Sequence, residues 1–136
     1  MCFITKKSKR LKVATEDITV YKFLEIKEGR VQSPSEGYIY TPNQMEETAI
    51  KISDHMSCFD NDDEEQLIKD YGEDWRGNEK LISYGEGFHF FTEKQGTEIR
   101  MRRWRGAVEL REFIVPKGAR YMTDRGLGIC DKIMMK

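Results

Sequence analysis

The chain has 136 residues, of which 38% are hydrophobic and 35% are charged, and its formal net charge at pH 7 is −1. This length is typical of one domain, and a nearly neutral chain has no overall field that would attract nucleic acid or a membrane surface. No apolar run approaches the roughly 18 residues that a membrane helix needs. The first residues are charged rather than apolar, unlike a secretory signal.

Three cysteines, Cys2, Cys58 and Cys130, are spread along the chain without a C-x-x-C pair. An odd number of cysteines at wide spacing predicts neither a disulfide framework nor a zinc site. The two histidines, His55 and His89, also lack the short spacing that metal-binding motifs show. We therefore expect reduced thiols, a cytoplasmic location, no bound metal and no cofactor.

Charge is segregated along the chain. A basic N-terminal segment covers residues 1–15, an acidic segment covers about residues 57–80, and four arginines lie within residues 100–105. Short charge runs are typical of solvated surfaces, and each of these three is also a candidate interaction site.

Alternating β-branched and aromatic residues predict strands, and glycine or proline marks the turns between them. Gly29 can adopt a positive φ in the first of these turns, and Ser33–Ser35 interrupts the strand that follows. Gly126 and Gly128 are interpreted as part of a loop before the last strand. The predicted strands are Val20–Ile26, a partner beginning at Val31, Gly37–Thr41, Thr48–Ile52, Gly87–Phe91, Val108–Val115, Arg120–Met122 and Ile129–Met134.

Two helices are predicted. Acidic residues in the first turn favour a short helix over Asp63–Tyr71, which Gly72 can end. Thr92, followed three residues later by Gln95, has the pattern of a capping box and predicts a second helix that runs to about Arg105. The prediction is a single α+β domain over residues 1–136, with a mostly antiparallel twisted sheet and about two short helices. The acidic helical segment is expected to be an insertion over the sheet.

The first candidate site residue is His89. It lies between a turn that contains Gly85 and Gly87 and an aromatic run. Histidine changes charge near neutral pH. In a strand, Phe88 and Phe90 share one face, and His89 and Phe91 share the other. The neighbouring glycines would let a ligand or another part of the backbone approach closely. His89 could therefore donate to a phosphate, ribose or carboxylate, or it could be a structural histidine bonded to a backbone carbonyl.

Six further residues are candidates for binding an anionic ligand. Arg103 belongs to the arginine cluster, and a guanidinium group suits phosphate, although arginines are also common on solvated helix faces. Lys117 and Arg120 lie in and beside a Pro–Lys–Gly–Ala turn and could reach an anion, although proline and glycine explain that turn without a ligand. The aromatic candidates are Tyr38, Tyr40 and Tyr121.

The order of several short motifs resembles that of a group of small uncharacterised proteins from bacteria and their phages. The resemblance spans most of the chain and implies no function. The motifs are Met1–Cys2, Tyr21–Lys22, Ser33–Pro34, Gly37–Tyr40, Gly85–His89 and Val115–Tyr121.

A shorter segment is similar to part of the ADP-ribosyltransferase-like folds. Gly87–Thr92 has their pattern of a glycine–aromatic strand that ends in threonine before a helix. This similarity implies an enzyme that uses NAD and carries a catalytic glutamate late in the chain. The last predicted strand has Asp131 and no glutamate, which departs from that pattern.

Three functions therefore remain open, and the first is favoured. It is a non-catalytic binding module for an anionic, nucleotide-like small molecule or for a host protein. A phage-encoded inhibitor would belong to this class. The second is an ADP-ribosyltransferase-like enzyme. The third is a nucleic-acid-binding accessory protein, which is disfavoured because the net charge is not basic. The oligomeric state is left open.

Overall fold

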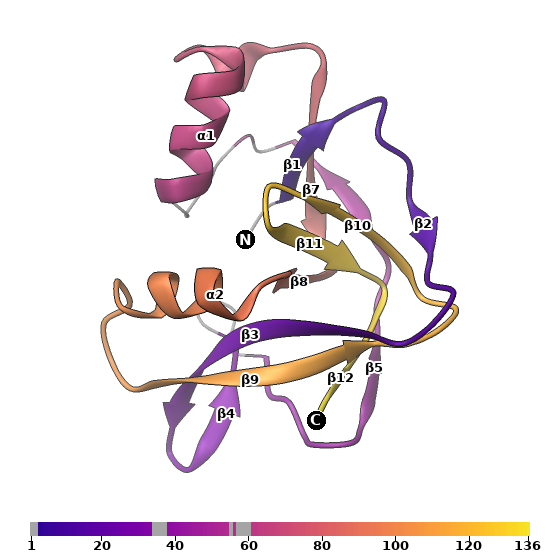
Figure 1. Ribbon diagram of the computed structural model, residues 1–136, viewed down its shortest axis with the longest axis vertical. Helices are drawn as coiled ribbons and strands as arrows, with labels where there is room; N and C mark the ends of the chain where they lie inside the picture. The colour runs from indigo at the N-terminus through magenta and orange to yellow at the C-terminus, as the bar shows by residue number, and fades with distance from the viewer. Residues whose placement is uncertain (1–2, 34–37, 55, 57–60) are drawn as a thin grey trace.

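The computed structural model describes residues 3–33, 38–54, 56 and 61–136 (Figure 1). Within this part of the chain, antiparallel strands dominate and two α-helices accompany them, which confirms the predicted α+β fold of a single domain. The helices are α1 (Asn61–Tyr71) and α2 (Lys94–Met101), with a 3-10 turn at Trp75–Gly77. The strands are β1 (Phe3–Lys6), β2 (Lys12–Val13), β3 (Ile18–Lys27), β4 (Arg30–Gln32), β5 (Met45–Glu47), β6 (Lys51–Ser53), β7 (Leu81–Glu86), β8 (Phe88–Phe91), β9 (Val108–Val115), β10 (Arg120–Asp124), β11 (Leu127–Cys130) and β12 (Lys132–Met135).

The strands form two sheets. The smaller sheet has the order β1-β7-β6, and the larger has the order β2-β10-β11-β8-β3-β9-β12-β5, with β4 also paired to β3. Strand β3 is central: β9 covers one of its edges from Ile18 to Glu25, while β8 and β4 share the other. The tight β3–β4 turn has positive φ at Glu28 and Gly29, as predicted for Gly29.

Gly87 is the corner at which the chain passes from the small sheet to the large one. Strand β7 ends at Glu86 in the small sheet, and β8 begins at Phe88 in the large sheet. Gly87 has φ +136°, and a Cβ atom there would lie 2.6 Å from Cγ1 of Ile129. Both its backbone conformation and its close contact therefore require glycine.

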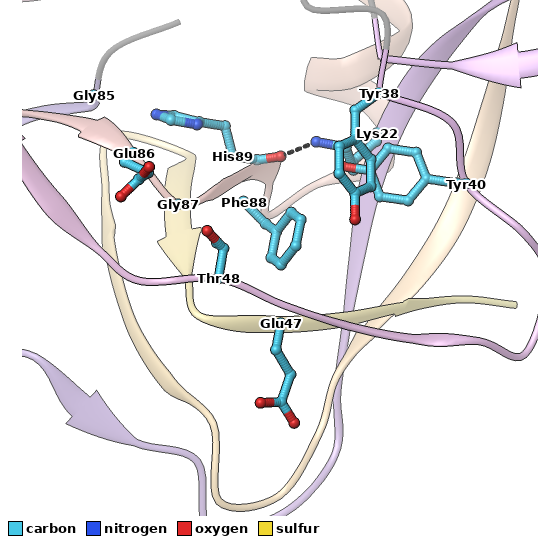
Figure 2. Close-up of a pocket in the computed structure, with 10 residues that line it drawn as sticks. All are labelled: Lys22, Tyr38, Tyr40, Glu47, Thr48, Gly85, Glu86, Gly87, Phe88 and His89. Carbon is cyan, nitrogen blue, oxygen red and sulfur yellow. Dashed lines mark hydrogen bonds between the residues drawn. The ribbon is translucent and has the colours of Figure 1, made fainter.

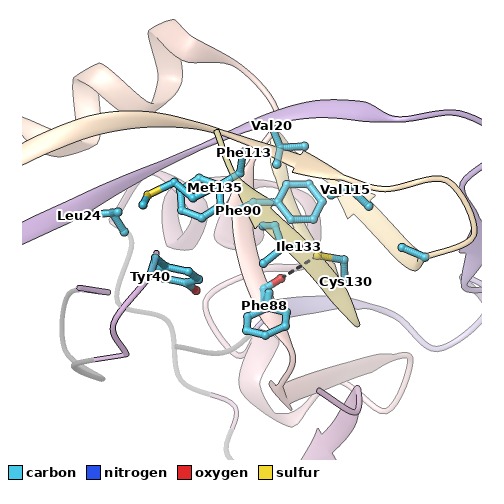
Figure 3. Close-up of a cluster of buried hydrophobic side chains, with 11 residues drawn as sticks. Val20, Leu24, Tyr40, Phe88, Phe90, Phe113, Val115, Cys130, Ile133 and Met135 are labelled. Atoms are coloured by element: carbon cyan, nitrogen blue, oxygen red, sulfur yellow. Dashed lines mark hydrogen bonds between the residues drawn. The ribbon is translucent and has the colours of Figure 1, made fainter. Parts of the chain in front are cut away.

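Three hydrophobic clusters fill the spaces around these sheets. The first lies on one face of the large sheet and includes Phe88, Phe113 and Cys130 (Figure 3). The second lies on its other face, where Phe23 and Phe91 stack under the segment that carries α2. Phe88 and Phe91 thus face opposite sides of β8, as the predicted alternation requires. The third cluster packs the α1 segment against the small sheet through Ile4, Leu67, Trp75 and Leu81.

Several predicted boundaries were wrong. The strand predicted at Thr48–Ile52 is replaced by β5 and β6, which lie on either side of residues 48–50 and belong to different sheets. Gly128 lies within β11 rather than in a loop, because it pairs with Phe90 on β8 and Thr123 on β10. A glycine is needed there because a Cβ atom would lie 2.2 Å from the Phe90 ring. The predicted last strand is divided at Asp131 into β11 and β12.

The second helix is shorter than predicted. It begins at Lys94 after Glu93, whose side chain forms no capping bond, whereas the N–H of Thr92 donates to the carbonyl of Gly126 at 3.0 Å. The helix ends at Met101 rather than near Arg105. Just beyond it, Trp104 contacts Phe23 with ring centroids 5.9 Å apart, so packing against the core turns the chain before a further helical turn can form.

Candidate functional site

Strands β8 and β4 pair with different parts of the same edge of β3, and a pocket opens in the gap between them. Strands β3 and β8 have one registered pair, Tyr21 with Phe91. Strand β4 pairs with β3 only from Glu25 onward. The edge of β3 around Lys22 is therefore not covered by a continuous neighbouring strand. The pocket has a volume of about 300 Å³ and is lined by Lys22, Tyr38, Tyr40, Glu47, Thr48, Gly85, Glu86, Gly87, Phe88 and His89 (Figure 2).

Lys22 is the most unusual of these residues. It occupies the core-facing position between Val20 and Leu24 on β3 and is only 8% exposed. Its Nζ donates to the main-chain carbonyl of His89 and lies 5.6 Å from the ring centroid of Tyr40. Lysine is almost never buried unless its charge has partners, because leaving water costs free energy. A positive charge is thus held in the wall of the pocket.

Three aromatic rings form the wall beside Lys22. Tyr38 contacts Tyr40 with centroids 5.0 Å apart and meets Phe88 edge to face at 5.8 Å. Tyr38 as a residue is 41% exposed and lines the pocket, so part of its surface is available to a ligand. Burial and the 2.7 Å hydrogen bond to Glu46 raise the pKa of the Tyr38 hydroxyl. Tyr38 therefore stays neutral and donates to Glu46, which fixes its orientation.

His89 contributes to the pocket mainly through its backbone. Its carbonyl oxygen accepts from Lys22, whereas its imidazole points away from Tyr38 and Tyr40 in Figure 2. This follows from the alternation on β8, which places the His89 side chain on the face opposite Phe88. Three of the candidate residues, His89, Tyr38 and Tyr40, thus line one pocket, with the imidazole turned away from the two tyrosines.

The glycines beside His89 accommodate the protein's own packing. At Gly85, a Cβ atom would lie 2.8 Å from Cβ of Ser53 on β6, and Gly87 is the corner against Ile129 described above. Of the two alternatives raised by the sequence, close approach of another part of the chain accounts for both positions. The acidic side chains Glu47 and Glu86 point away from the aromatic wall, and Glu86 pairs with Lys51 at 3.4 Å.

The other four predicted residues lie elsewhere. Arg103 follows α2 and forms a 2.9 Å ion pair with Asp62 on α1. Lys117 lies in the turn between β9 and β10, and Arg120 begins β10 with an exposed side chain. Tyr121 is half-buried and packs against the first hydrophobic cluster. None of these four residues lines the pocket at Lys22.

Cys130 lies in the first cluster close to the pocket wall but is not reactive there. It is fully buried, and its Sγ donates to the carbonyl of Phe88 at 3.7 Å. Burial raises the pKa of the Cys130 thiol to about 12, against an opposing influence of the Lys22 charge. The thiol is therefore neutral at physiological pH, and it acts as a small apolar side chain.

A second pocket, of about 380 Å³, lies between the β1–β2 loop, the end of α1 and the β10–β11 turn. It contains Arg125, which binds Asp63 at 2.6 Å and Asp124 at 2.7 Å and also donates to the carbonyl of Ile4. Burial lowers the pKa of Arg125, but Asp63 and Asp124 outweigh this effect and the net shift is upward. This network joins α1 to the sheets, so its charges are committed to structure.

No group of three metal-binding side chains occurs within the described residues. In the same part of the chain, no helix is long and apolar enough to cross a membrane. Comparisons with protein-family models, curated proteins and solved structures found no match to this chain. The resemblances noted from the sequence therefore stay predictions, and the pocket geometry is the basis for any functional proposal.

Sequence reasoning missed Lys22 as a site residue. A usable signal existed, because a period of two along β3 places Lys22 on the same face as Val20 and Leu24. A single lysine on an otherwise apolar strand face departs from the usual alternation, and in the structure this lysine lines the pocket.

Proposed function

We propose that this protein is a non-catalytic binding module for a small, anionic, nucleotide-like molecule. The observation that carries the proposal is the buried Lys22, a residue only 8% exposed, which lines the pocket and carries a positive charge. A buried positive charge attracts an anion more strongly than an exposed one, because water screens it less. The exposed carboxylates of Glu47 and Glu86 point away from it and are screened by solvent.

The aromatic wall supports a ligand that also carries a planar ring. Tyr38 is 41% exposed, and its ring is packed against the rings of Tyr40 and Phe88. Aromatic stacking suits a nucleobase, while the hydroxyl of Thr48 offers a hydrogen-bonding group at the pocket wall. Apolar walls with few polar anchors are the usual composition of small-molecule sites. A cytoplasmic location, where nucleotides are abundant, is part of the proposal.

The size of the pocket favours one ring with one charged group over a dinucleotide. At about 300 Å³ it lies at the lower end of the range for ligand pockets. Asp131, the late acidic residue considered for transferase chemistry, accepts a hydrogen bond from the N–H of Arg120 at 2.9 Å and lies at the β11–β12 junction. This contact gives Asp131 a structural role and adds no support for NAD-dependent transfer. If the protein released nicotinamide from NAD, the ADP-ribosyltransferase-like alternative would replace the binding proposal.

The test is a thermal-shift and calorimetric screen of the full chain against nucleoside mono-, di- and cyclic phosphates, NAD and ADP-ribose. Matched variants are Lys22→Met and Lys27→Met, since both lysines lie on β3 but Lys27 is exposed. A compound that stabilises the native protein should raise its melting temperature by mass action. The expected result is a shift that Lys27→Met retains and Lys22→Met abolishes. A shift that persists in Lys22→Met, or no shift with any compound, would overturn the proposal.

A further inference from the structure

The strand β2 forms one border of the large sheet (Figure 1). It pairs with β10 on one side, with Val13 opposite Arg120 and Lys12 opposite Tyr121. On its other side, no strand of the described residues covers it. An open edge presents unpaired backbone groups that can pair with another extended chain.

The ladder shows which of these backbone groups are free. The N–H of Ala14 donates to the carbonyl of Ala119 at 2.9 Å, and the carbonyl of Arg120 accepts from Asp131 on the other side of β10. In an antiparallel ladder, hydrogen-bonded and non-hydrogen-bonded pairs alternate. The pair Val13–Arg120 is therefore non-hydrogen-bonded, and the N–H and C=O of Val13 point outward from the sheet.

Side chains along the same border combine apolar surface with positive charge. Val13 is 59% exposed and Leu11 is 39% exposed. Four exposed cations lie on or beside this border, and none of the four forms an ion pair within the described residues. Three acids also lie close to this border: Asp17 accepts from the N–H of Lys117, Asp131 accepts from the N–H of Arg120 on the β11 side of β10, and Glu16 is exposed in the β2–β3 loop. The four cations are Arg10, Lys12, Lys117 and Arg120.

From this arrangement we infer that the β2 border is a docking surface for an extended acidic segment of a partner protein, which adds a strand to the large sheet. The outward N–H and C=O of Val13 would pair with the partner backbone, as in other strand-addition complexes. Leu11 and Val13 supply apolar contact, and the cations complement acidic side chains. The border exposes aliphatic rather than aromatic side chains, so it lacks the stacking platform that favours single-stranded nucleic acid. This surface is separate from the Lys22 pocket.

The test uses fluorescence anisotropy with the full chain and a labelled peptide in which glutamate and valine alternate. The counterpart peptide carries lysine in place of glutamate. Val13→Pro removes the outward N–H, and proline is tolerated where an edge strand faces solvent. The matched control Val13→Thr keeps that N–H and the branched shape. Lys12→Glu changes the charge without removing a backbone donor.

We expect the acidic peptide to bind and its lysine counterpart not to bind. Loss of one backbone hydrogen bond in Val13→Pro should weaken binding about fivefold or more, with Val13→Thr within about twofold of the unmodified chain. Binding should also weaken in Lys12→Glu and between 50 and 200 mM salt, on the order of several-fold, because exposed charges are screened. A cooperative melting transition establishes that each variant is folded. If Val13→Pro does not fold, Lys12→Glu provides the test.

Three results would overturn the inference. Equal binding by Val13→Pro and Val13→Thr, both folded, would show that the backbone edge is not used. Tighter binding of a labelled oligothymidylate than of the acidic peptide would identify nucleic acid as the partner of the basic border. If the acidic peptide did not bind at millimolar concentration, the inference would be wrong, and the cations on this border would serve only to prevent edge-to-edge pairing.

Discussion

The Nζ atom of Lys22 donates a hydrogen bond to the main-chain carbonyl of His89 at the place where β3 and β8 separate. Continuing the antiparallel register of Tyr21 with Phe91 would place His89 opposite Phe23, so a ladder bond would ordinarily be expected nearby. Instead of a backbone N–H of β3, the Lys22 side chain donates to the His89 carbonyl, from the core-facing side of β3. The same residue thus stabilises the divergence of the strands and places a charge in the pocket that the divergence opens.

Lys22→Ala is expected to destabilise the fold more than Lys22→Met. Alanine removes the buried aliphatic stem and leaves the His89 carbonyl without this donor, at a combined cost of about 2–4 kcal/mol. Methionine keeps most of the stem volume, so its cost should be about half as large or less. Urea unfolding of the two variants and the unmodified chain measures this difference. An equal loss in both variants would mean that the hydrogen bond, and not the packing of the stem, dominates.

Asp63→Asn is expected to destabilise the attachment of α1 strongly. Asp63 is almost fully buried and binds Arg125 at 2.6 Å, so removing its charge leaves the buried guanidinium with only the more exposed Asp124 of its two ion-pair partners, at a cost of about 3 kcal/mol. The adjacent residue provides the control, since Asp62 pairs with Arg103 at a partly exposed site. Asp62→Asn should cost about 1 kcal/mol or less. Denaturant midpoints of the two single variants decide the matter, and similar values would contradict the structural role of Arg125.

Gly87→Ala is expected to be far more damaging than Gly29→Ala. Both glycines have positive φ, so alanine is strained at either position by about 1 kcal/mol or more. Only at Gly87 would the added methyl group also meet Ile129, whereas nothing lies within 4 Å of the corresponding point at Gly29. Thermal unfolding of both variants tests this expectation. A Gly87→Ala protein as stable as Gly29→Ala would show that the β7–β8 corner can relax.

The stability of the protein should fall at alkaline pH because of Cys130. The folded protein holds the pKa of this thiol at about 12, above the ordinary value of 9.0, so the folded state keeps a proton that the unfolded state releases. This contribution is fully present below pH 9 and is lost as the pH rises toward 12. Above pH 9 the loss approaches about 1.4 kcal/mol per pH unit.

The matched variant for this measurement is Cys130→Ala. Urea unfolding between pH 7 and 10.5 should give a smaller alkaline decrease for the alanine variant than for the unmodified chain, because lysine and tyrosine titrations are common to both. The variant is also expected to be less stable at pH 7, since it leaves a small cavity in the first cluster. Parallel pH profiles would show that Cys130 does not titrate on unfolding in this range.

Local patterns predicted the elements whose signal lies within one segment. The alternation of β3 and β9, the positive φ of Gly29 and the acidic start of α1 all follow from neighbouring residues. The failures arise from contacts between distant segments. Gly128 was interpreted as a loop residue because the sequence does not show that the Phe90 ring covers it, and the end of α2 depends on the contact of Trp104 with Phe23.

The candidate site shows the same division. Tyr38, Tyr40 and His89 were predicted and lie together, but the direction of the His89 imidazole depends on which face of β8 meets the pocket. Arg103, Lys117, Arg120 and Tyr121 were chosen for their chemistry and lie outside this pocket, because no local pattern reports which distant strands become neighbours. Lys22 was detectable from its position on an apolar face, provided that the strand period was applied to every residue of β3.

The bend at Gly87 has a consequence for cooperativity. Because β7 and β8 are a single stretch of chain with one residue between them, the two sheets share a covalent and closely packed junction at Ile129. Local opening of the small sheet would pull directly on the strand that borders the Lys22 pocket. Amide hydrogen exchange in β7 and β8 should therefore report one common opening free energy, and a ligand bound at the pocket should slow exchange in both sheets together.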